Sequence, residues 1–217
     1  MKKIFFLTIF VFLNSLAFAK YYPGKIYLNS GEVIEAKIEP PLQPTDKQIS
    51  YTAEKKLLKI ESNLINSLSI ILQDQKVVFV YRDVGNMKGS TKKCWAVLQY
   101  GSDWMNVYCT ANKYEINKFN QLNLTTSNGN FNHEISFYLI KKGENQLYKV
   151  FDYNDGLINK KDFNDKIATY CEDEPLLVKS IRNDEFSWKD LYKLAEVYNT
   201  LKKYKEVKKE KYKNNKG

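Results

Sequence analysis

The sequence predicts an α+β protein, with a predominantly antiparallel β-sheet in the N-terminal part followed by three helices in the C-terminal part. Up to about residue 156, short runs of β-branched and aromatic residues alternate with turn residues. Beyond that point apolar residues recur every three or four positions, which is typical of helices. Aromatic residues make up 14% of the chain and include 16 Tyr, a residue type that sheets favour. Strands first and helices afterwards is the chain order of the α+β class.

Residues 1–19 have the pattern of a signal peptide. Lys2 and Lys3 precede an apolar run, and Ala17-Phe18-Ala19 supplies the small residues that signal peptidase requires, so cleavage is expected before Lys20. The run is short for a membrane span, and no later run approaches ~18 apolar residues. The pattern predicts an exported, soluble chain in the periplasm or outside the cell, with no transmembrane anchor after cleavage. The alternative is an N-terminal anchor that is never cut.

The predicted sheet occupies residues 20–156 and begins with a hairpin. Residues 24–28 and 33–38 alternate apolar and polar side chains around a turn. The prolines at positions 40, 41 and 44 then end the ladder, because proline has no N–H to donate. Further strands are expected at 49–51, 57–60, 68–72, 76–84, 135–140 and 146–151, whereas 114–124 fits no single pattern.

The stretch 94–109 predicts a central β-hairpin with a two-residue turn at Gly101-Ser102. In that register Cys94 lies opposite Cys109, so these two are the candidate disulfide among the three cysteines of a chain in an oxidising compartment. The register also puts them at a hydrogen-bonded position, where the Cβ atoms lie further apart. The bridged and the free states therefore both stay open. Cys171 is expected to be a small buried hydrophobe.

One face of the predicted hairpin carries Trp95, Gln99, Trp104 and Tyr108. These four side chains are candidates for a platform that binds a partner or a sugar. The alternative, which we prefer, is that a second sheet layer or a helix covers this face, since the chain has helices available for that purpose.

Three helices are predicted over residues 157–203. Asn159 with Asp162 gives the first a start signal, and Pro175 suits the first turn of the second. Ser187 with Asp190 caps the third.

The net charge of +9 is local. The two lysines of the signal peptide contribute two of these charges, and residues 201–217 contribute six through eight Lys against Glu206 and Glu210, which leaves +1 for the body. A nearly neutral body excludes a nucleic-acid-binding face, which needs basic residues spread over the fold. Residues 204–217 are expected to be a disordered, Lys-rich tail that either solubilises the chain or contacts anionic lipid or polymer.

The sequence contains no motif for a cofactor, a metal or a catalytic site. Residues 152–158 match a calcium loop only in part, because Phe151 and Tyr153 stand where oxygen ligands are needed. The acidic cluster at 172–174 complements the start of a helix. The single histidine, His133, has no nucleophile motif beside it.

Two parts of the chain resemble a loosely defined group of exported bacterial α+β proteins of unassigned function. The first is the opening hairpin, Gly24-Lys25-Ile26-Tyr27 with residues 31–38, in which Ala36 stands where the group often has Gly. The second is the helical end, through Asp162-Phe163, Tyr170-Cys171, Pro175-Leu176 and Tyr198-Asn199. The resemblance covers about a quarter of the chain, and it implies no site, activity or cofactor.

Three hypotheses about function remain. The leading one is a non-catalytic cell-envelope protein that binds a partner protein or a surface polymer. The second is a small hydrolase or sugar-processing enzyme that uses Asp152, Asp155 and Glu172 to Glu174, which requires two carboxylates about 5–10 Å apart in one cleft. The third is a structural subunit that assembles with its own copies through exposed hairpin edges.

Overall fold

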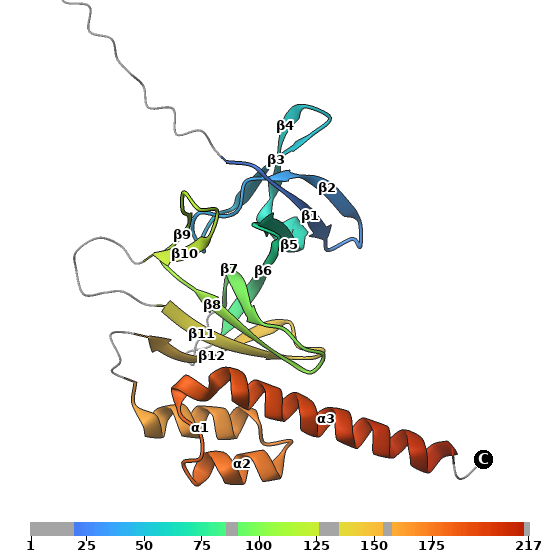
Figure 1. Ribbon diagram of the computed structural model, residues 1–217, viewed down its shortest axis with the longest axis vertical. Coiled ribbons are helices and arrows are strands. Elements are labelled where there is room, and N and C mark those ends of the chain that lie inside the picture. The colour runs from blue at the N-terminus through green and yellow to red at the C-terminus, as the bar shows by residue number, and fades with distance from the viewer. Residues whose placement is uncertain (1–19, 86–90, 126–134, 154–157, 215–217) are drawn as a thin grey trace, which may run out of the picture.

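One long strand, β6 (Gln75–Gly85), connects the two halves of the sheet. In the computed structural model, which describes residues 20–85, 91–125, 135–153 and 158–214, β6 pairs with β5 (Ile65–Leu72) through its first part and with β7 (Thr91–Tyr100) through its second (Figure 1). Beyond β5 lie β1 (Tyr22–Leu28), β2 (Val33–Ile38), β3 (Gln48–Ala53) and β4 (Lys56–Glu61). The fold is α+β and mostly strands, as the sequence predicts.

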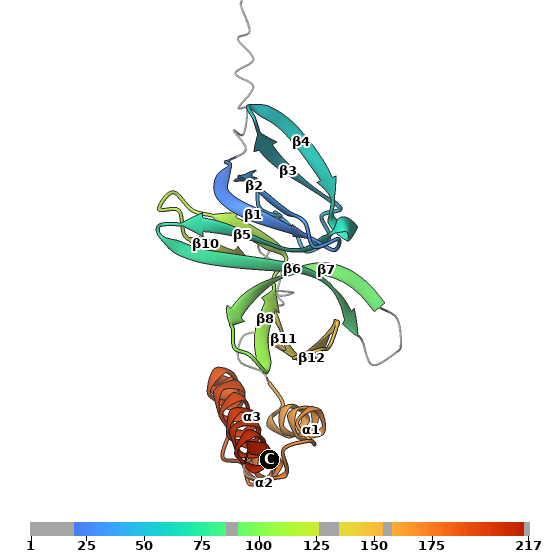
Figure 2. The same ribbon diagram turned by 90° about the vertical axis from the view of Figure 1, so that its right-hand side faces the viewer.

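The second half of the sheet closes into a five-stranded barrel. After β7 come β8 (Met105–Thr110), β11 (Ile135–Lys141) and β12 (Gln146–Tyr153), and β12 returns to β6 (Figure 2). This closing pair is parallel, with Leu147 opposite Val84, while the other pairs between the described strands are antiparallel. Side chains from all five strands fill the barrel: Val80, Ala96, Tyr108, Tyr138, Ile140 and Leu147.

A second core lies between β1, β5 and the outer face of β6 and β7. Its large side chains include Phe79 and Trp95, both fully buried. A small hairpin, β9 (Lys113–Ile116) with β10 (Leu122–Thr125), adds Tyr114, whose ring meets Phe79 edge-on at 5.6 Å and whose hydroxyl donates to the Trp95 carbonyl at 2.6 Å. The stretch 114–124, which fitted no single pattern, is thus mostly this hairpin.

The register of the β7–β8 hairpin differs from the predicted one. Val97 lies opposite Cys109 and Leu98 opposite Tyr108, and a bulge at Gln99 adds one residue to β7. The connection spans residues 101–104, and the Asn106 side chain accepts a hydrogen bond from the Ser102 N–H at 2.7 Å. A longer loop and a bulge replace the two-residue turn, so the predicted pairing is wrong.

This register separates the two candidate disulfide cysteines. Cys94 lies opposite Arg82 of β6, on the same side of β7 as Ala96 in the barrel. Cys109 belongs to the core on the opposite side, beside Val97. Both thiols are free and buried, so the pairing inferred from the hairpin is not formed. Cys171 is fully buried, in agreement with its interpretation as a small hydrophobe.

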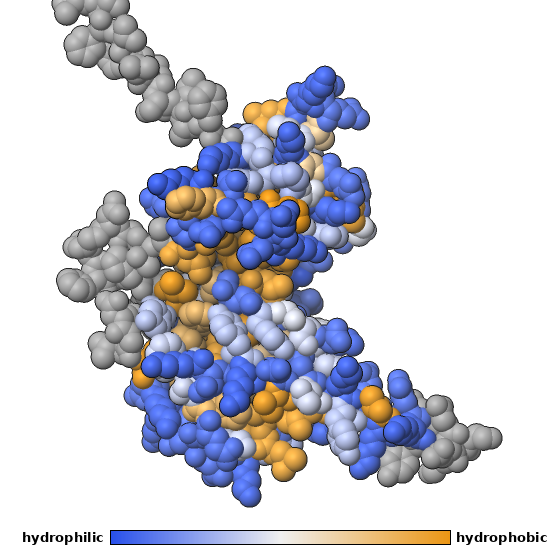
Figure 3. Space-filling view, viewed as in Figure 1, coloured by the Kyte–Doolittle hydropathy of each residue, from blue (hydrophilic) through white to orange (hydrophobic). Residues whose placement is uncertain are grey.

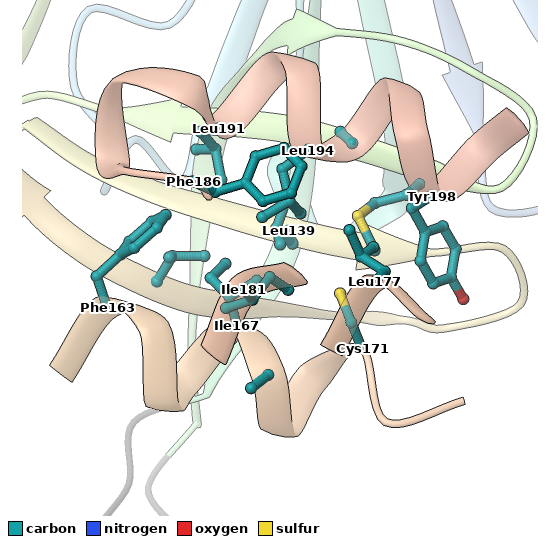
Figure 4. Packing of buried hydrophobic residues seen from close by; sticks show 14 of the residues in the cluster. Leu139, Phe163, Ile167, Cys171, Leu177, Ile181, Phe186, Leu191, Leu194 and Tyr198 are labelled. Atoms are coloured by element: carbon teal, nitrogen blue, oxygen red, sulfur yellow. The ribbon is translucent and has the colours of Figure 1, made fainter. Parts of the chain in front are cut away.

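Three helices cover the outer face of β8, β11 and β12. They are α1 (Lys160–Tyr170), α2 (Pro175–Arg182) and α3 (Leu191–Asn214), the last preceded by a 3₁₀ turn at Trp188–Asp190, and a second 3₁₀ turn at Ser62–Leu64 precedes β5. The start signals are confirmed: the Asn159 side chain accepts from the Asp162 N–H, Pro175 begins α2, and Ser187 and Asp190 form a capping box. Figure 4 shows the apolar side chains of the helices gathered around Leu139 of β11.

The Lys-rich end of the chain is helical. α3 continues through Asn214, which overturns the expectation that residues 204–217 are disordered over their whole length. Lysine and glutamate are good helix formers, and α3 is already nucleated on the core by its first half. The signal-peptide segment 1–19, His133 and Asp155 lie outside the described residues.

Candidate binding cleft

A cleft lies between the β11–β12 hairpin and α1. Its volume is about 700 Å³, and it is lined by Gly85, Glu144, Asn145, Gln146, Leu147, Tyr148, Lys149, Asp152, Lys166 and Tyr170. Most of these residues belong to one hairpin, and α1 contributes the last two. The end of β6 reaches the cleft because the parallel pairing with β12 places Gly85 opposite Tyr148.

Two secondary-structure elements hold the walls in place. Lys166 and Tyr170 stand four residues apart on α1, so they occupy the same face of the helix. The opposite wall depends on the hairpin turn, where Gly143 adopts a φ of +88° that a residue with a side chain rarely takes. The Glu144 N–H donates to the Lys141 carbonyl at 3.1 Å, and its carboxylate accepts from the Lys141 N–H at 3.0 Å.

A stacked pair of tyrosines lines the cleft. The rings of Tyr148 and Tyr170 lie 4.5 Å apart at an angle of 12°. The Tyr148 hydroxyl donates to the Lys166 carbonyl at 3.3 Å, and the Tyr170 hydroxyl donates to the Glu144 carboxylate. Lys141 Nζ sits 4.6 Å from the centre of the Tyr170 ring. Both rings are therefore held by contacts on more than one side.

The two phenols stay protonated. Burial raises the pKa of Tyr170 far above its usual value, and the Glu144 carboxylate raises it further because it accepts a hydrogen bond from the protonated phenol and would repel a phenolate. Burial also raises the pKa of Tyr148. At neutral pH both groups are neutral phenols and do not supply a phenolate.

Charged side chains of both signs line the same cleft. Lys149 Nζ pairs with Asp152 at 2.6 Å, and Lys166 pairs with Asp162 at 2.7 Å. Asp152 also accepts from the Ser136 hydroxyl at 2.5 Å. With Glu144, the lining carries two ammonium groups and two carboxylates, so its formal charges balance.

The four predicted platform residues do not share a face. Trp95 is fully buried in the core beneath β1 and β5, and its indole N–H donates to the Asp46 carbonyl and the Ser62 hydroxyl, both at 3.1 Å. Tyr108 points into the barrel and is also buried. Gln99 is exposed at the bulge, and Trp104 packs at the edge of the helical core. The alternative that we prefer, in which a second sheet layer or a helix covers this face, agrees with the burial of Trp95.

The carboxylates of the enzyme hypothesis are dispersed among the described residues. Asp152 lines the cleft. Asp173 and Glu174 lie just before α2 and form ion pairs with Lys141, Lys202 and Lys205. Glu172 is exposed on the surface. Over the part of the chain that is described, there is also no cluster of His, Cys, Asp or Glu that fits a metal ion.

The sequence interpretation missed the cleft residues Glu144, Tyr148, Lys166 and Tyr170. Tyr148 fell within a predicted strand and Tyr170 within a predicted helix, and the two elements gave no sign that they pack together. The high tyrosine content was the one feature of the sequence that was relevant to the cleft, and it did not indicate which tyrosines would line it.

No protein family model, curated protein or solved structure matches the chain.

None of the described helices combines the length and the apolar character needed to cross a membrane.

Proposed function

We propose that this chain is an exported, non-catalytic binding module of the bacterial cell envelope, and that its cleft takes a saccharide unit of a surface polymer. The observation that carries the proposal is the stacked pair Tyr148 and Tyr170 beside charge-balanced polar side chains, in one cavity of about 700 Å³. A large concave site with an aromatic wall and a few convergent polar groups is the usual form of a ligand site.

The chemistry of the lining favours a neutral, polyhydroxylated ligand. A sugar ring has an apolar face, which suits an aromatic wall, and hydroxyls that both donate and accept hydrogen bonds. Lys149 and Lys166 supply donors, while Glu144 and Asp152 supply acceptors. Because these charges balance, a ligand of high net charge would lose hydration without gaining a counter-charge.

Export is supported by the pattern of residues 1–19. Its test is the N-terminus of the protein recovered from its native host. Mass spectrometry of the envelope fraction should find a chain that begins at Lys20. A chain recovered with Met1 intact, in the cytosolic fraction, would contradict the proposal.

The ligand test measures binding of soluble peptidoglycan fragments and surface polysaccharides to the chain of residues 20–217 by calorimetry. Replacing Tyr148 with Ala should weaken binding roughly tenfold, since aromatic contacts contribute about 0.5–1.5 kcal/mol beyond the area they bury. Tyr51→Ala, a half-buried tyrosine on β3 away from the cleft, is the matched control. Binding that is absent for every glycan, or equal in both variants, would refute the saccharide proposal.

A second candidate function, self-assembly, is favoured by one observation. β4 is the outermost strand of the ten-stranded sheet, and Leu57 and Leu58 on it are 61% and 40% exposed. Lys56 and Lys59 on the same strand oppose edge-to-edge pairing. Light scattering over a wide concentration range should show a monomer under the binding-module proposal and a growing mass under self-assembly.

A further inference from the structure

The second half of α3 extends beyond the rest of the protein. The first half of the helix packs on the core through Leu191, Leu194, Ala195 and Tyr198. From Leu201 onward the side chains become progressively exposed, and the helix runs past α1 and α2 into solvent (Figure 1). We call residues 203–211 of this helix the basic arm.

An ion-pair network fixes the direction in which the arm leaves the body. Glu174 is only 2% exposed, and its carboxylate pairs with Lys202 at 3.0 Å and Lys205 at 2.6 Å. Asp173 accepts from Tyr198 at 2.7 Å and pairs with Lys202 at 2.5 Å. A carboxylate this buried is stable only with its partners in place, so the base of the arm is held rigidly.

The arm has two different sides. Lys202 and Lys205 share the side of α3 that faces Asp173 and Glu174. Tyr204, Val207, Lys208 and Lys211 follow the spacing i, i+3, i+4, i+7, so they form a separate stripe that points away from these acids. Tyr204 is 67% exposed and Val207 is 44% exposed. Figure 3 shows this part of the surface as largely hydrophilic with a small hydrophobic patch.

The stripe combines positive charge with apolar surface. Residues 203–211 contain five lysines and two glutamates, and Glu206 and Glu210 lie one turn apart on another side of the helix. The stripe places one aromatic and one aliphatic side chain, Tyr204 and Val207, beside two lysines. Basic residues beside aromatic and apolar ones also occur on helices that lie on a lipid surface. Tyrosine is also enriched at the level of the lipid headgroups.

We propose that the basic arm docks on an anionic lipid surface. Lys208 and Lys211 bind the headgroup phosphates, while Tyr204 and Val207 enter the headgroup layer. The charge complementarity and the apolar pair on the same stripe favour lipid over a soluble polyanion, which would use the lysines alone. The contact is weak and reversible, because only two apolar side chains are buried. It would hold the cleft close to a membrane, and it does not depend on what the cleft binds.

The test is co-sedimentation of the chain of residues 20–217 with lipid vesicles. Binding is expected to vesicles that contain phosphatidylglycerol and not to vesicles of phosphatidylcholine alone, and it should fall as ionic strength rises. Replacing Lys208 and Lys211 with Gln should weaken binding roughly 30-fold, since each lysine near such a surface contributes about 1 kcal/mol, or about fivefold. The matched control replaces two exposed lysines on other helices, Lys161 of α1 and Lys179 of α2, with Gln.

A second variant, Tyr204→Ser with Val207→Ser, separates the two classes of partner. Both positions are exposed, so the fold should be retained, and circular dichroism checks this directly. Weaker vesicle binding is the expected result. Unchanged vesicle binding in this variant, equal binding to both kinds of vesicle, or no binding at all would overturn the proposal. Tight binding to a soluble polyanion that leaves vesicles unbound would assign the arm to a polymer instead.

Discussion

The side-chain amide of Asn199 on α3 and the backbone of Met105 at the start of β8 exchange two hydrogen bonds. Asn199 Oδ1 accepts from the Met105 N–H at 2.9 Å, and Nδ2 donates to the Met105 carbonyl at 3.0 Å. Oδ1 also accepts from the Trp104 N–H at 2.8 Å. Both Asn199 and Met105 are buried. The amide therefore joins the long helix to the barrel at the edge of the helical core.

Replacing Asn199 with Leu should lower the free energy of unfolding by about 3 kcal/mol, because each buried backbone group deprived of its partner costs roughly 1–3 kcal/mol. Urea denaturation measures the change. Thr200→Ala is the control, since Thr200 is exposed and bonds only to its own helix at Glu196. An Asn199→Leu protein as stable as the Thr200→Ala protein would show that these bonds contribute little.

Local signals in the sequence predicted the elements of the fold well. The caps at Asn159 and Ser187 and the proline at position 175 act within a few residues, so each could be recognised from its neighbours alone. The period of two in residues 24–38 likewise located β1 and β2. Barrel closure could not be predicted, because β6 and β12 pair across some sixty residues of intervening chain.

The candidate site was harder to predict because it depends on two adjacent elements packing in one specific way. A bulge at Gln99 and a longer loop moved Cys94 and Cys109 to opposite sides of the sheet, and a shift by an odd number of residues changes the face of every side chain. Tyr148 and Tyr170 meet only after α1 has docked on β12. No spacing of residues in the sequence predicts that contact.

The three cysteines should all be free thiols in the purified protein. Burial raises the pKa of Cys94, Cys109 and Cys171 to about 12 in each case, so almost no thiolate forms at pH 8. A thiol reagent should react slowly with the native chain and with three groups per chain in guanidinium. Mass spectrometry of an unreduced digest provides the check: a linked peptide joining Cys94 to Cys109 would show that the β7–β8 register described above is incorrect.

Trp95→Phe should destabilise the protein by about 1–3 kcal/mol, because the Asp46 carbonyl and the Ser62 hydroxyl would each lose the hydrogen bond that they accept from the indole N–H. Trp104→Phe, at a partly exposed position, should cost less than 1 kcal/mol and serves as the control. Thermal unfolding compares the two. If Trp95 were part of an exposed platform, the order of the two effects would be reversed or the costs would be equal.

The pH dependence of stability should report the network at the base of the arm. Burial opposes ionisation of Asp173, but hydrogen bonds from Lys141, Lys202 and Tyr198 outweigh it and hold the pKa of this carboxyl well below its usual 3.8. A group whose pKa is lowered by folding stabilises the folded state above its unfolded pKa, and this contribution is lost as the pH falls through its folded pKa.

Asp173→Asn should therefore be less stable than the wild-type protein at pH 7, and the difference between the two should shrink as the pH falls below 3.8. Urea unfolding at a series of pH values measures both curves. Glu172→Gln, at the exposed neighbouring position, is the matched control and should follow the wild-type curve. A difference between Asp173→Asn and wild type that stays constant from neutral to acid pH would mean that Asp173 contributes through packing rather than through its charge.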